Sequence, residues 1–217
     1  MNQKPAIRIQ PVEASRPSLA LMPTDSAQKW CSPFDDNGFE PAVKVFVTQP
    51  AYALMCVHAA SEMHQETGGV MVGQCYEDTG THASFIVVES ALPARFTRQG
   101  SVYLTFTQDT IVNFHDEIED RFPGKQIVGW YHTHPKMGIF LSHYDTWLHS
   151  HFFPEPWQVA LVIEPHKQLG GLFIRQTDGA FDPSCYFGFY ELEENPKWSI
   201  VHWNNLHRVE DDTREGG

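Results

Sequence analysis

Two histidines separated by one residue, His132 and His134, are the side chains of this sequence best suited to chemistry. The segment that carries them, QIVGWYHTH, is typical of a β-strand, and residues two apart on a strand point to the same face, so both imidazoles can reach one cation. Asp145 lies one turn into a following helix and can return a carboxylate to the same point. Three such ligands leave a fourth tetrahedral position for water, which is the layout of a catalytic zinc site.

The complete spacing is specific, although the histidine pair alone is not. With 12 histidines in 217 residues, about 0.7 such pairs are expected by chance. Requiring Ser142 and Asp145 at their fixed offsets lowers the expectation to about 0.002. His149 and His151 form a second pair, but residues two apart in a helix lie on different faces, so we interpret them as surface or packing residues.

This segment resembles the JAMM motif of the MPN+ family of zinc metallo-isopeptidases, and the chain is similar to prokaryotic-type stand-alone members of that family. The family signature adds a glutamate before a glycine-rich strand, and Glu66 stands directly before TGGVMVG. The resemblance implies one zinc per chain with ligands His132, His134 and Asp145. It also implies that Glu66 is the general base and acid, and that Ser142 donates a hydrogen bond to the oxyanion.

Structural interpretations stand beside these roles. Ser142 with Asp145 three residues later resembles a helix-start cap, which is compatible with catalysis. Glu66 could be a solvated helix end, and the two histidines could be core residues with other partners. The residues predicted to line a groove for an extended peptide tail are Trp130, Tyr131, Met137, Ile139 and Phe140. Plain sheet packing explains Trp130 at least equally well.

The surrounding pattern predicts the elements that position these side chains. Strands are expected around VKVFV, VMVGQCY, ASFIVVESAL, QIVGWYHTH, WQVALVIEP, GGLFIRQT and CYFGFYEL. Helices are expected over 52–65, ended by Gly68 and Gly69, over 105–122 and over 142–153. This mixed order predicts an α+β (α/β sandwich) fold with a curved mixed sheet flanked by helices. The resemblance implies the MPN/JAMM fold.

The chain divides into three predicted regions. Residues 1–41 are proline-rich without helical or strand periodicity, which predicts an N-terminal arm or linker. Residues 42–192 would form the catalytic domain, and residues 193–217 an acidic C-terminal tail.

Composition excludes several classes of function. The formal net charge of −12 argues against binding to nucleic acid or to an anionic membrane surface. No apolar run approaches the roughly 18 residues that span a bilayer. The four cysteines form no C-x-x-C pair and the start lacks a secretory signal, which predicts free thiols and a cytoplasmic location.

The resemblance implies a zinc-dependent isopeptidase that hydrolyses the amide bond after a glycine-ended, ubiquitin-like tail, either in a conjugate with lysine or in a precursor. Its partners would be a ubiquitin-like protein or its conjugate and the conjugation enzymes of the same pathway. Two alternatives stay open. The chain could be a non-catalytic MPN scaffold that docks through its arm or tail, or a JAMM peptidase that acts on a sulfur-carrier or phage-type substrate.

Overall fold

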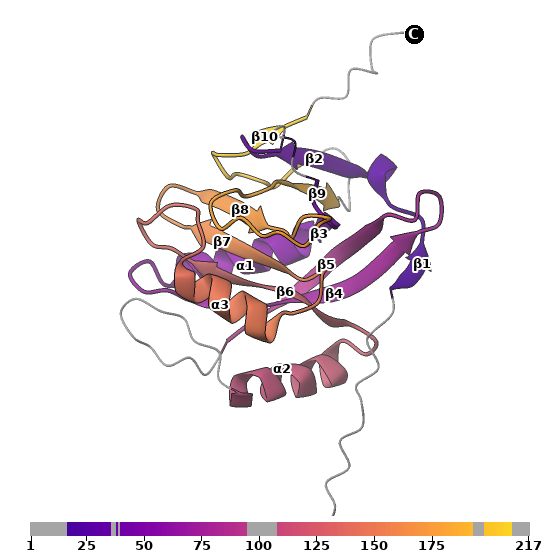
Figure 1. Ribbon diagram of the computed structural model, residues 1–217. Helices are drawn as coiled ribbons and strands as arrows, with labels where there is room; N and C mark the ends of the chain where they lie inside the picture. Colours follow the sequence, from indigo (N-terminus) through magenta and orange to yellow (C-terminus); the bar gives the residue numbers. More distant parts are fainter. Residues whose placement is uncertain (1–16, 36–37, 39, 95–107, 193–197, 210–217) are drawn as a thin grey trace, which may run out of the picture.

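The computed structural model describes residues 17–35, 38, 40–94, 108–192 and 198–209 (Figure 1). The strands in these residues are β1 (Ser18–Ala20), β2 (Ala27–Cys31), β3 (Lys44–Thr48), β4 (Gly68–Asp78), β5 (Ser84–Pro93), β6 (Gln126–Thr133), β7 (Val159–Glu164), β8 (Leu169–Phe173), β9 (Phe189–Leu192) and β10 (His207–Arg208). The helices are the 3-10 helix η1 (Thr24–Ser26) and the α-helices α1 (Gln49–Ser61), α2 (Gln108–Arg121) and α3 (His143–Phe152).

All of these strands belong to one mixed sheet. Their order is β10-β2-β9-β3-β5-β4-β6-β7-β8, with β1 beside β4. β6 is parallel to β7 and antiparallel to β4, and β3 is parallel to both β5 and β9. A bridge between Leu172 in β8 and Phe187, just before β9, links distant parts of this order, so the sheet curls. The prediction of a curved mixed sheet is confirmed.

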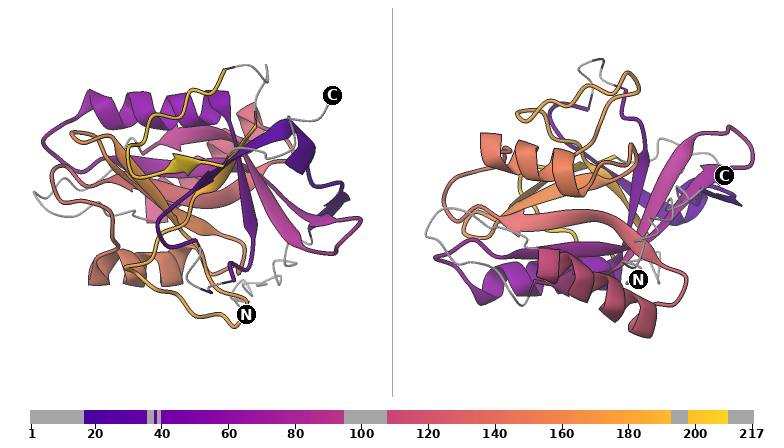
Figure 2. Two further views of the ribbon diagram at one scale, coloured as in Figure 1. Left: turned by 90° about the horizontal axis from the view of Figure 1, so that it is seen from above. Right: turned by 60° about the horizontal axis from the view of Figure 1, so that its bottom comes forward.

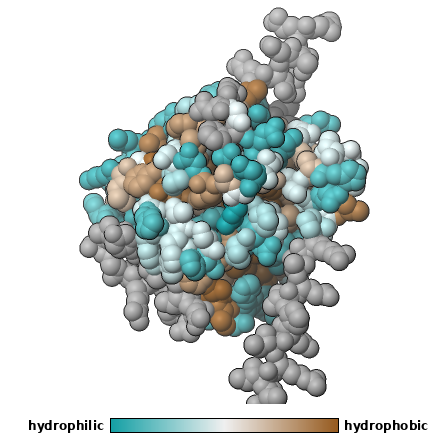
Figure 3. Space-filling model, in the orientation of Figure 1, coloured by the Kyte–Doolittle hydropathy of each residue, from teal (hydrophilic) through white to brown (hydrophobic). Residues whose placement is uncertain are grey.

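Helices cover both faces of the sheet (Figure 2). α1 packs on one face, where Tyr52 and Met55 belong to the first hydrophobic core. α2 and α3 pack on the other face, where Phe114, Ile118 and Leu148 belong to the second core. The outer surface seen in Figure 3 is mainly hydrophilic, with hydrophobic residues in small groups. No helix of the described residues is long and apolar enough to cross a membrane.

β6 contributes side chains to both cores. Val128 and Tyr131 lie in the first core, and Ile127 and Trp130 lie in the second. Side chains of a strand alternate between its faces, and the register shift in the β4–β6 pairing between Gly129 and Ile127 interrupts this alternation, so Val128 and Trp130 lie in different cores. β6 is covered on both sides, so all its residues after Gln126 are buried. The strand that carries His132 and leads into His134 is therefore a buried central element of the fold.

α1 begins and ends earlier than the predicted range of 52–65. Its first residue is Gln49, because the Thr48 hydroxyl caps the helix by accepting a hydrogen bond from the Ala51 N–H at 3.4 Å, and Pro50 suits the first turn. Its last residue is Ser61.

The sequence predicts that Gly68 and Gly69 end the first helix. In the structure they instead begin β4. A Cβ atom at Gly69 would lie 2.1 Å from the Leu92 carbonyl oxygen of β5. Glycine is thus required there because the backbones of β4 and β5 approach closely.

Parts of the expected arm and tail belong to the sheet. β1 and β2 lie within residues 1–41, and β10 pairs with β2. Trp203 and Leu206, in the expected tail, are buried in the first core. The prediction that residues 1–41 form an arm or linker is therefore wrong for β1 and β2, which belong to the sheet. These short strands are stabilised by residues far along the chain, which a local pattern does not reveal. Residues 1–16, 193–197 and 210–217 lie outside the described residues.

Candidate metal centre

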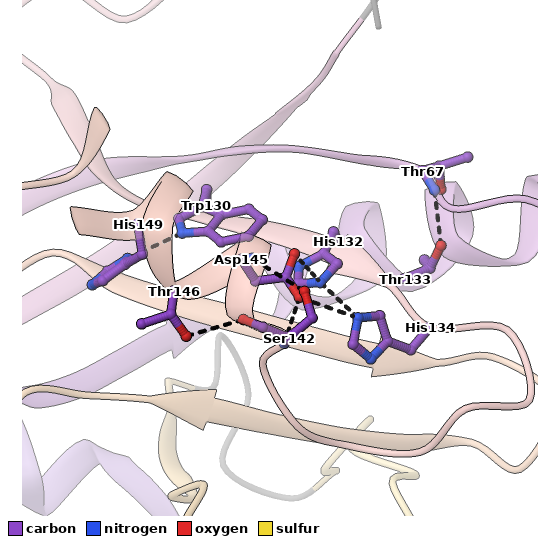
Figure 4. A network of polar contacts seen from close by, with 9 residues as sticks. All are labelled: Thr67, Trp130, His132, Thr133, His134, Ser142, Asp145, Thr146 and His149. Carbon is purple, nitrogen blue, oxygen red and sulfur yellow. Dashed lines mark hydrogen bonds and ion pairs between the residues drawn. The ribbon is translucent and has the colours of Figure 1, made fainter. Parts of the chain in front are cut away.

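The side chains of His132, His134 and Asp145 converge in the structure (Figure 4). The two histidine Nε2 atoms are 2.9 Å apart. Asp145 Oδ1 lies 3.5 Å from Nε2 of His132, and Oδ2 lies 3.7 Å from Nε2 of His134. Within the described residues, this is the one group of three or more histidine, cysteine or acidic side chains that could hold a metal ion.

Two elements bring these side chains together. His132 is in β6, and His134 follows its end, where the His134 N–H donates to the Ile163 carbonyl of β7 at 2.8 Å. Asp145 is in the first turn of α3, which Ser142 caps. The Asp145 N–H donates to Ser142 Oγ at 3.2 Å, and the Ser142 N–H donates to Asp145 Oδ2 at 2.7 Å. The predicted cap is thus present, and it orients the carboxylate toward the histidines.

The chemistry of this group suits zinc. His132, His134 and Asp145 are exposed by only 0%, 2% and 4%. The histidine Nδ1 atoms find no hydrogen-bond partner among the described residues, while both Nε2 atoms point at one another and at the carboxylate. A cation between them would accept both nitrogen lone pairs and balance the buried carboxylate charge. Two imidazoles and one carboxylate are also a common ligand set of catalytic zinc.

The protonation states also favour a cation. Burial lowers the pKa of His132 and outweighs the opposing effect of the Asp145 carboxylate, so this imidazole is neutral at neutral pH. Burial alone would raise the pKa of Asp145, but the adjacent His132 and His134 imidazoles and the cap with Ser142 hold it well below its usual range. A neutral imidazole and an ionised carboxylate are the forms that bind metals.

Glu66 lies at the same end of the sheet as the histidines. Gly68 is the β4 partner of His132. The Thr133 N–H donates to the Thr67 carbonyl at 2.8 Å, and the Thr67 N–H donates to Thr133 Oγ1 at 2.9 Å, so this pairing continues past β4 (Figure 4). Glu66 directly precedes Thr67 in the chain and is half-buried. The pairing of β4 with β6 therefore places the Glu66 backbone at the end of the sheet where the histidines lie.

Trp130 and Tyr131 do not line a groove, which corrects the sequence prediction. Both are 0% exposed because β6 is covered on both faces. Trp130 lies in the second core. Tyr131 points the other way, and its hydroxyl contacts Nδ1 of His58 in α1 at 2.9 Å.

The other predicted groove residues lie in the loop after the histidines. Met137 and Phe140 are exposed by 44% and 38%, and Ile139 is half-buried. The Phe140 ring lies over His134, with 4.7 Å between ring centroids. Their contact with a substrate stays a prediction.

Two neighbouring features were not predicted. Tyr144 and Trp147 stack at 5.6 Å and, with Ser142 and His143, line an open hollow beside the site. Their spacing along an exposed helix face was a usable sequence signal. Glu164 is fully buried at the end of β7 and accepts N–H groups that include that of Lys136, which holds the turn after the histidines. No local pattern marks that contact.

A curled mixed sheet with helices on both faces, and with a buried His-x-His at a strand end beside a capped helix, defines an MPN-type domain. Protein DSY2949 of Desulfitobacterium hafniense has a similar fold in its solution structure, with a TM-score of 0.52 and 19% identity over 70% of this chain and 93% of that chain. The chain belongs to the family described as JAB1/Mov34/MPN/PAD-1 ubiquitin protease, whose profile matches residues 41–154.

Relatives in this comparison are similar over part of their length. COP9 signalosome complex subunit 5 of Yarrowia lipolytica is 30% identical over 58% of this chain and 34% of that protein. NAD(+) hydrolase TcpA of Theionarchaea archaeon is 36% identical over 33% of this chain and 21% of that protein. The 26S proteasome non-ATPase regulatory subunit 14 of Caenorhabditis elegans is 24% identical over 82% of this chain and 54% of that protein. The chain therefore spans from about a fifth to about half of these relatives.

Proposed function

We propose that this protein is a zinc-dependent hydrolase that cleaves the amide bond after a glycine-ended, ubiquitin-like tail. The convergence of His132, His134 and Asp145 in one buried group is the observation that carries the proposal. Membership of a family described as ubiquitin protease, and similarity to COP9 signalosome and proteasome subunits, support this substrate class and the conjugation enzymes of the same pathway as partners.

Each side chain of the site has a role in the proposed reaction. One zinc held by His132, His134 and Asp145 would supply Lewis acidity, which lowers the pKa of a bound water from about 15.7 to about 7. Glu66 takes a proton from the attacking water and returns it to the leaving amine. The Ser142 hydroxyl donates to the carbonyl oxygen as negative charge develops there. A hydroxyl both accepts and donates, so Ser142 can cap α3 as well.

The loop residues Met137, Ile139 and Phe140 would contact the substrate tail. Phe140 is placed for this because its ring covers His134 at the mouth of the site. The same site would serve an isopeptide bond to lysine or a linear bond in a precursor, since both present an amide after glycine. The cytoplasm, where such conjugates occur, is the location that fits this proposal.

The test begins with zinc content per chain, measured by elemental mass spectrometry on the wild type and Asp145→Ala. We expect one zinc in the wild type and loss of zinc in the variant. A ubiquitin-like protein fused through its terminal glycine to a reporter then serves as substrate. Glu66→Gln should retain zinc but lose turnover. A wild type that takes up no zinc after reconstitution would overturn the proposal.

The alternatives give different results in the same assays. A non-catalytic scaffold would bind the fusion without cleaving it, even with the conjugation enzymes of the pathway present. A peptidase for sulfur-carrier or phage-type substrates would bind zinc and depend on Glu66, but would cleave those substrates in preference to the fusion. In that case the site assignment stands and the substrate class is wrong.

A further inference from the structure

Trp130 lies between the proposed ligand His132 and a third buried histidine, His149 (Figure 4). The indole and the His132 imidazole are stacked nearly parallel, with ring centroids 4.6 Å apart and planes 10° apart. At its other edge, the indole N–H donates a hydrogen bond to Nδ1 of His149 at 3.1 Å. Trp130 and His132 are 0% exposed and His149 is 1% exposed, so water does not compete for these contacts.

The usual restraint on a metal-binding histidine is absent among the described residues. Such a histidine ordinarily donates its second ring N–H to an acceptor, which fixes the orientation of the ring. Nδ1 of His132 has no hydrogen-bond partner in the described part of the chain. The flat stack on Trp130 covers one face of this imidazole and can restrain its rotation, provided that the indole is itself held in place.

We propose that His149 is a positioning residue for His132. Its Nδ1 fixes the indole of Trp130, and the face of the indole holds the imidazole with Nε2 directed at His134 and Asp145. The proposal rests on the metal site of the proposed function, but not on the reaction or its substrate.

Packing alone does not account for a histidine at this position. Because Nδ1 accepts the indole N–H, the ring proton of His149 is on Nε2, which is buried without a partner among the described residues. An apolar side chain would remove this buried donor but would also remove the hydrogen-bond acceptor of the indole N–H. The property that an apolar side chain lacks is the acceptor Nδ1.

The surroundings keep His149 in the accepting form and in one orientation. Burial lowers the pKa of His149 to about 3, and the Arg175 charge adds to the effect. The ring is stacked on Phe181, with centroids 4.8 Å apart, and on Phe153, with centroids 6.2 Å apart. Phe153 also stacks on Trp130 at 5.8 Å, so one group of rings holds both partners of the hydrogen bond.

The test is the affinity of the purified protein for Zn²⁺, measured by competition with a chromogenic chelator. The visible absorption spectrum of the Co²⁺-substituted protein adds a readout of ligand geometry. His149→Leu, which removes the acceptor, should weaken zinc binding by about 10- to 100-fold and change the cobalt spectrum. His149→Gln, whose side-chain oxygen can accept the indole N–H, should recover most of the affinity.

The matched control is His151→Leu, in the same helix. His151 is exposed and contacts the Trp147 carbonyl through Nδ1 at 2.7 Å, so its loss should leave zinc affinity unchanged. Trp130→Phe keeps an aromatic face but cuts the link to His149, and it should weaken zinc binding even if His149→Leu does not fold. In the Trp130→Phe background, replacing His149 should have little further effect.

Two results separate this inference from the proposed function. If the wild type binds zinc and a folded His149→Leu binds it as tightly with the same cobalt spectrum, the positioning role is wrong and the metal site stands. If the wild type binds no zinc, the metal site is wrong and this inference is lost with it. Failure to cleave ubiquitin-like fusions bears on the proposed function alone, because the test measures no hydrolysis.

Discussion

At the scale of the residue, Ser142 combines two roles that experiment can separate. Ser142→Ala removes the cap acceptor of α3 and the proposed oxyanion donor. We expect a loss of about 1 kcal/mol in the free energy of unfolding and about 10²- to 10³-fold in kcat. Ser142→Thr keeps a hydroxyl and should recover most of the stability and most of the kcat. Urea unfolding and fusion cleavage are the measurements. An alanine variant that loses stability but keeps kcat would leave Ser142 with the cap alone.

His149 gives the protein a specific sensitivity to acid. Burial lowers its pKa from 6.5 to about 3, so between these pH values the unfolded chain binds a proton that the folded chain does not. Stability must therefore fall as pH decreases through this window, by up to about 1.4 kcal/mol per pH unit. His149→Leu should lose this part of the pH dependence, measured by urea unfolding of zinc-free protein from pH 7 to pH 4. His151→Leu should follow the wild type, and a parallel pH profile for His149→Leu would contradict the assignment.

The proposed ligands were predictable because their geometry is local. Strand alternation aligns His132 with His134, and a helix cap orients Asp145, and both rules can be read from spacing. Trp130 and Tyr131 were placed wrongly because proximity to the ligands in sequence was taken as proximity to a groove. β6 is covered on both faces, and that depends on where α1 and α3 pack.

At the scale of the element, the start of β4 depends on Gly69. In Gly69→Ala the new methyl group would meet the Leu92 carbonyl oxygen at 2.1 Å and Pro93 Cα at 2.9 Å, and backbone atoms cannot move aside as a side chain can. We expect a loss of at least about 2 kcal/mol in the free energy of unfolding. Because β4 also positions Glu66, any activity of the folded variant should fall.

Gly80 provides the control for this prediction. It lies in the turn between β4 and β5, and a Cβ atom there would be in ordinary contact with Asp78 Oδ2, at 3.4 Å. Gly80→Ala should change the free energy of unfolding by no more than about 0.5 kcal/mol. Equal effects of the two substitutions in urea unfolding would show that the close approach of β4 and β5 does not determine stability.

Elements were predictable where their own residues carry the pattern. Apolar runs indicated the central strands, and helical spacing with a cap indicated α3. β1, β2 and β10 carry no such pattern, because their stability comes from partners far along the chain, such as the Trp30 pairing with Phe189. The end of α1 was also missed, since Gly68 and Gly69 serve the packing of two strands rather than a helix end.

At the scale of the whole molecule, Glu191 joins segments that the sequence analysis had separated. This fully buried carboxylate in β9 accepts hydrogen bonds from four groups. Oε2 accepts from Trp30 Nε1 in β2 at 3.0 Å and from Ser199 Oγ at 2.6 Å. Oε1 accepts from Gln49 Nε2 at the start of α1 at 3.0 Å and from the Ile200 N–H at 2.9 Å. One side chain thus connects β2, α1 and the segment after residue 197 to the sheet.

Glu191→Ala should therefore destabilise the molecule as a whole. It removes the acceptor of four part-buried hydrogen bonds, each worth up to about 1–3 kcal/mol, so we expect a loss of about 3 kcal/mol in the free energy of unfolding. Glu191→Gln keeps one acceptor oxygen but turns an amide donor toward existing donors. Its free energy of unfolding should therefore lie between those of the wild type and Glu191→Ala. Limited proteolysis should then cleave the alanine variant within residues 17–35 and 198–209 faster than the wild type. If Glu191→Ala changed neither the free energy of unfolding nor the rate of cleavage, these two segments would not contribute to the cooperative unfolding of the sheet. They would then behave as an arm and a tail.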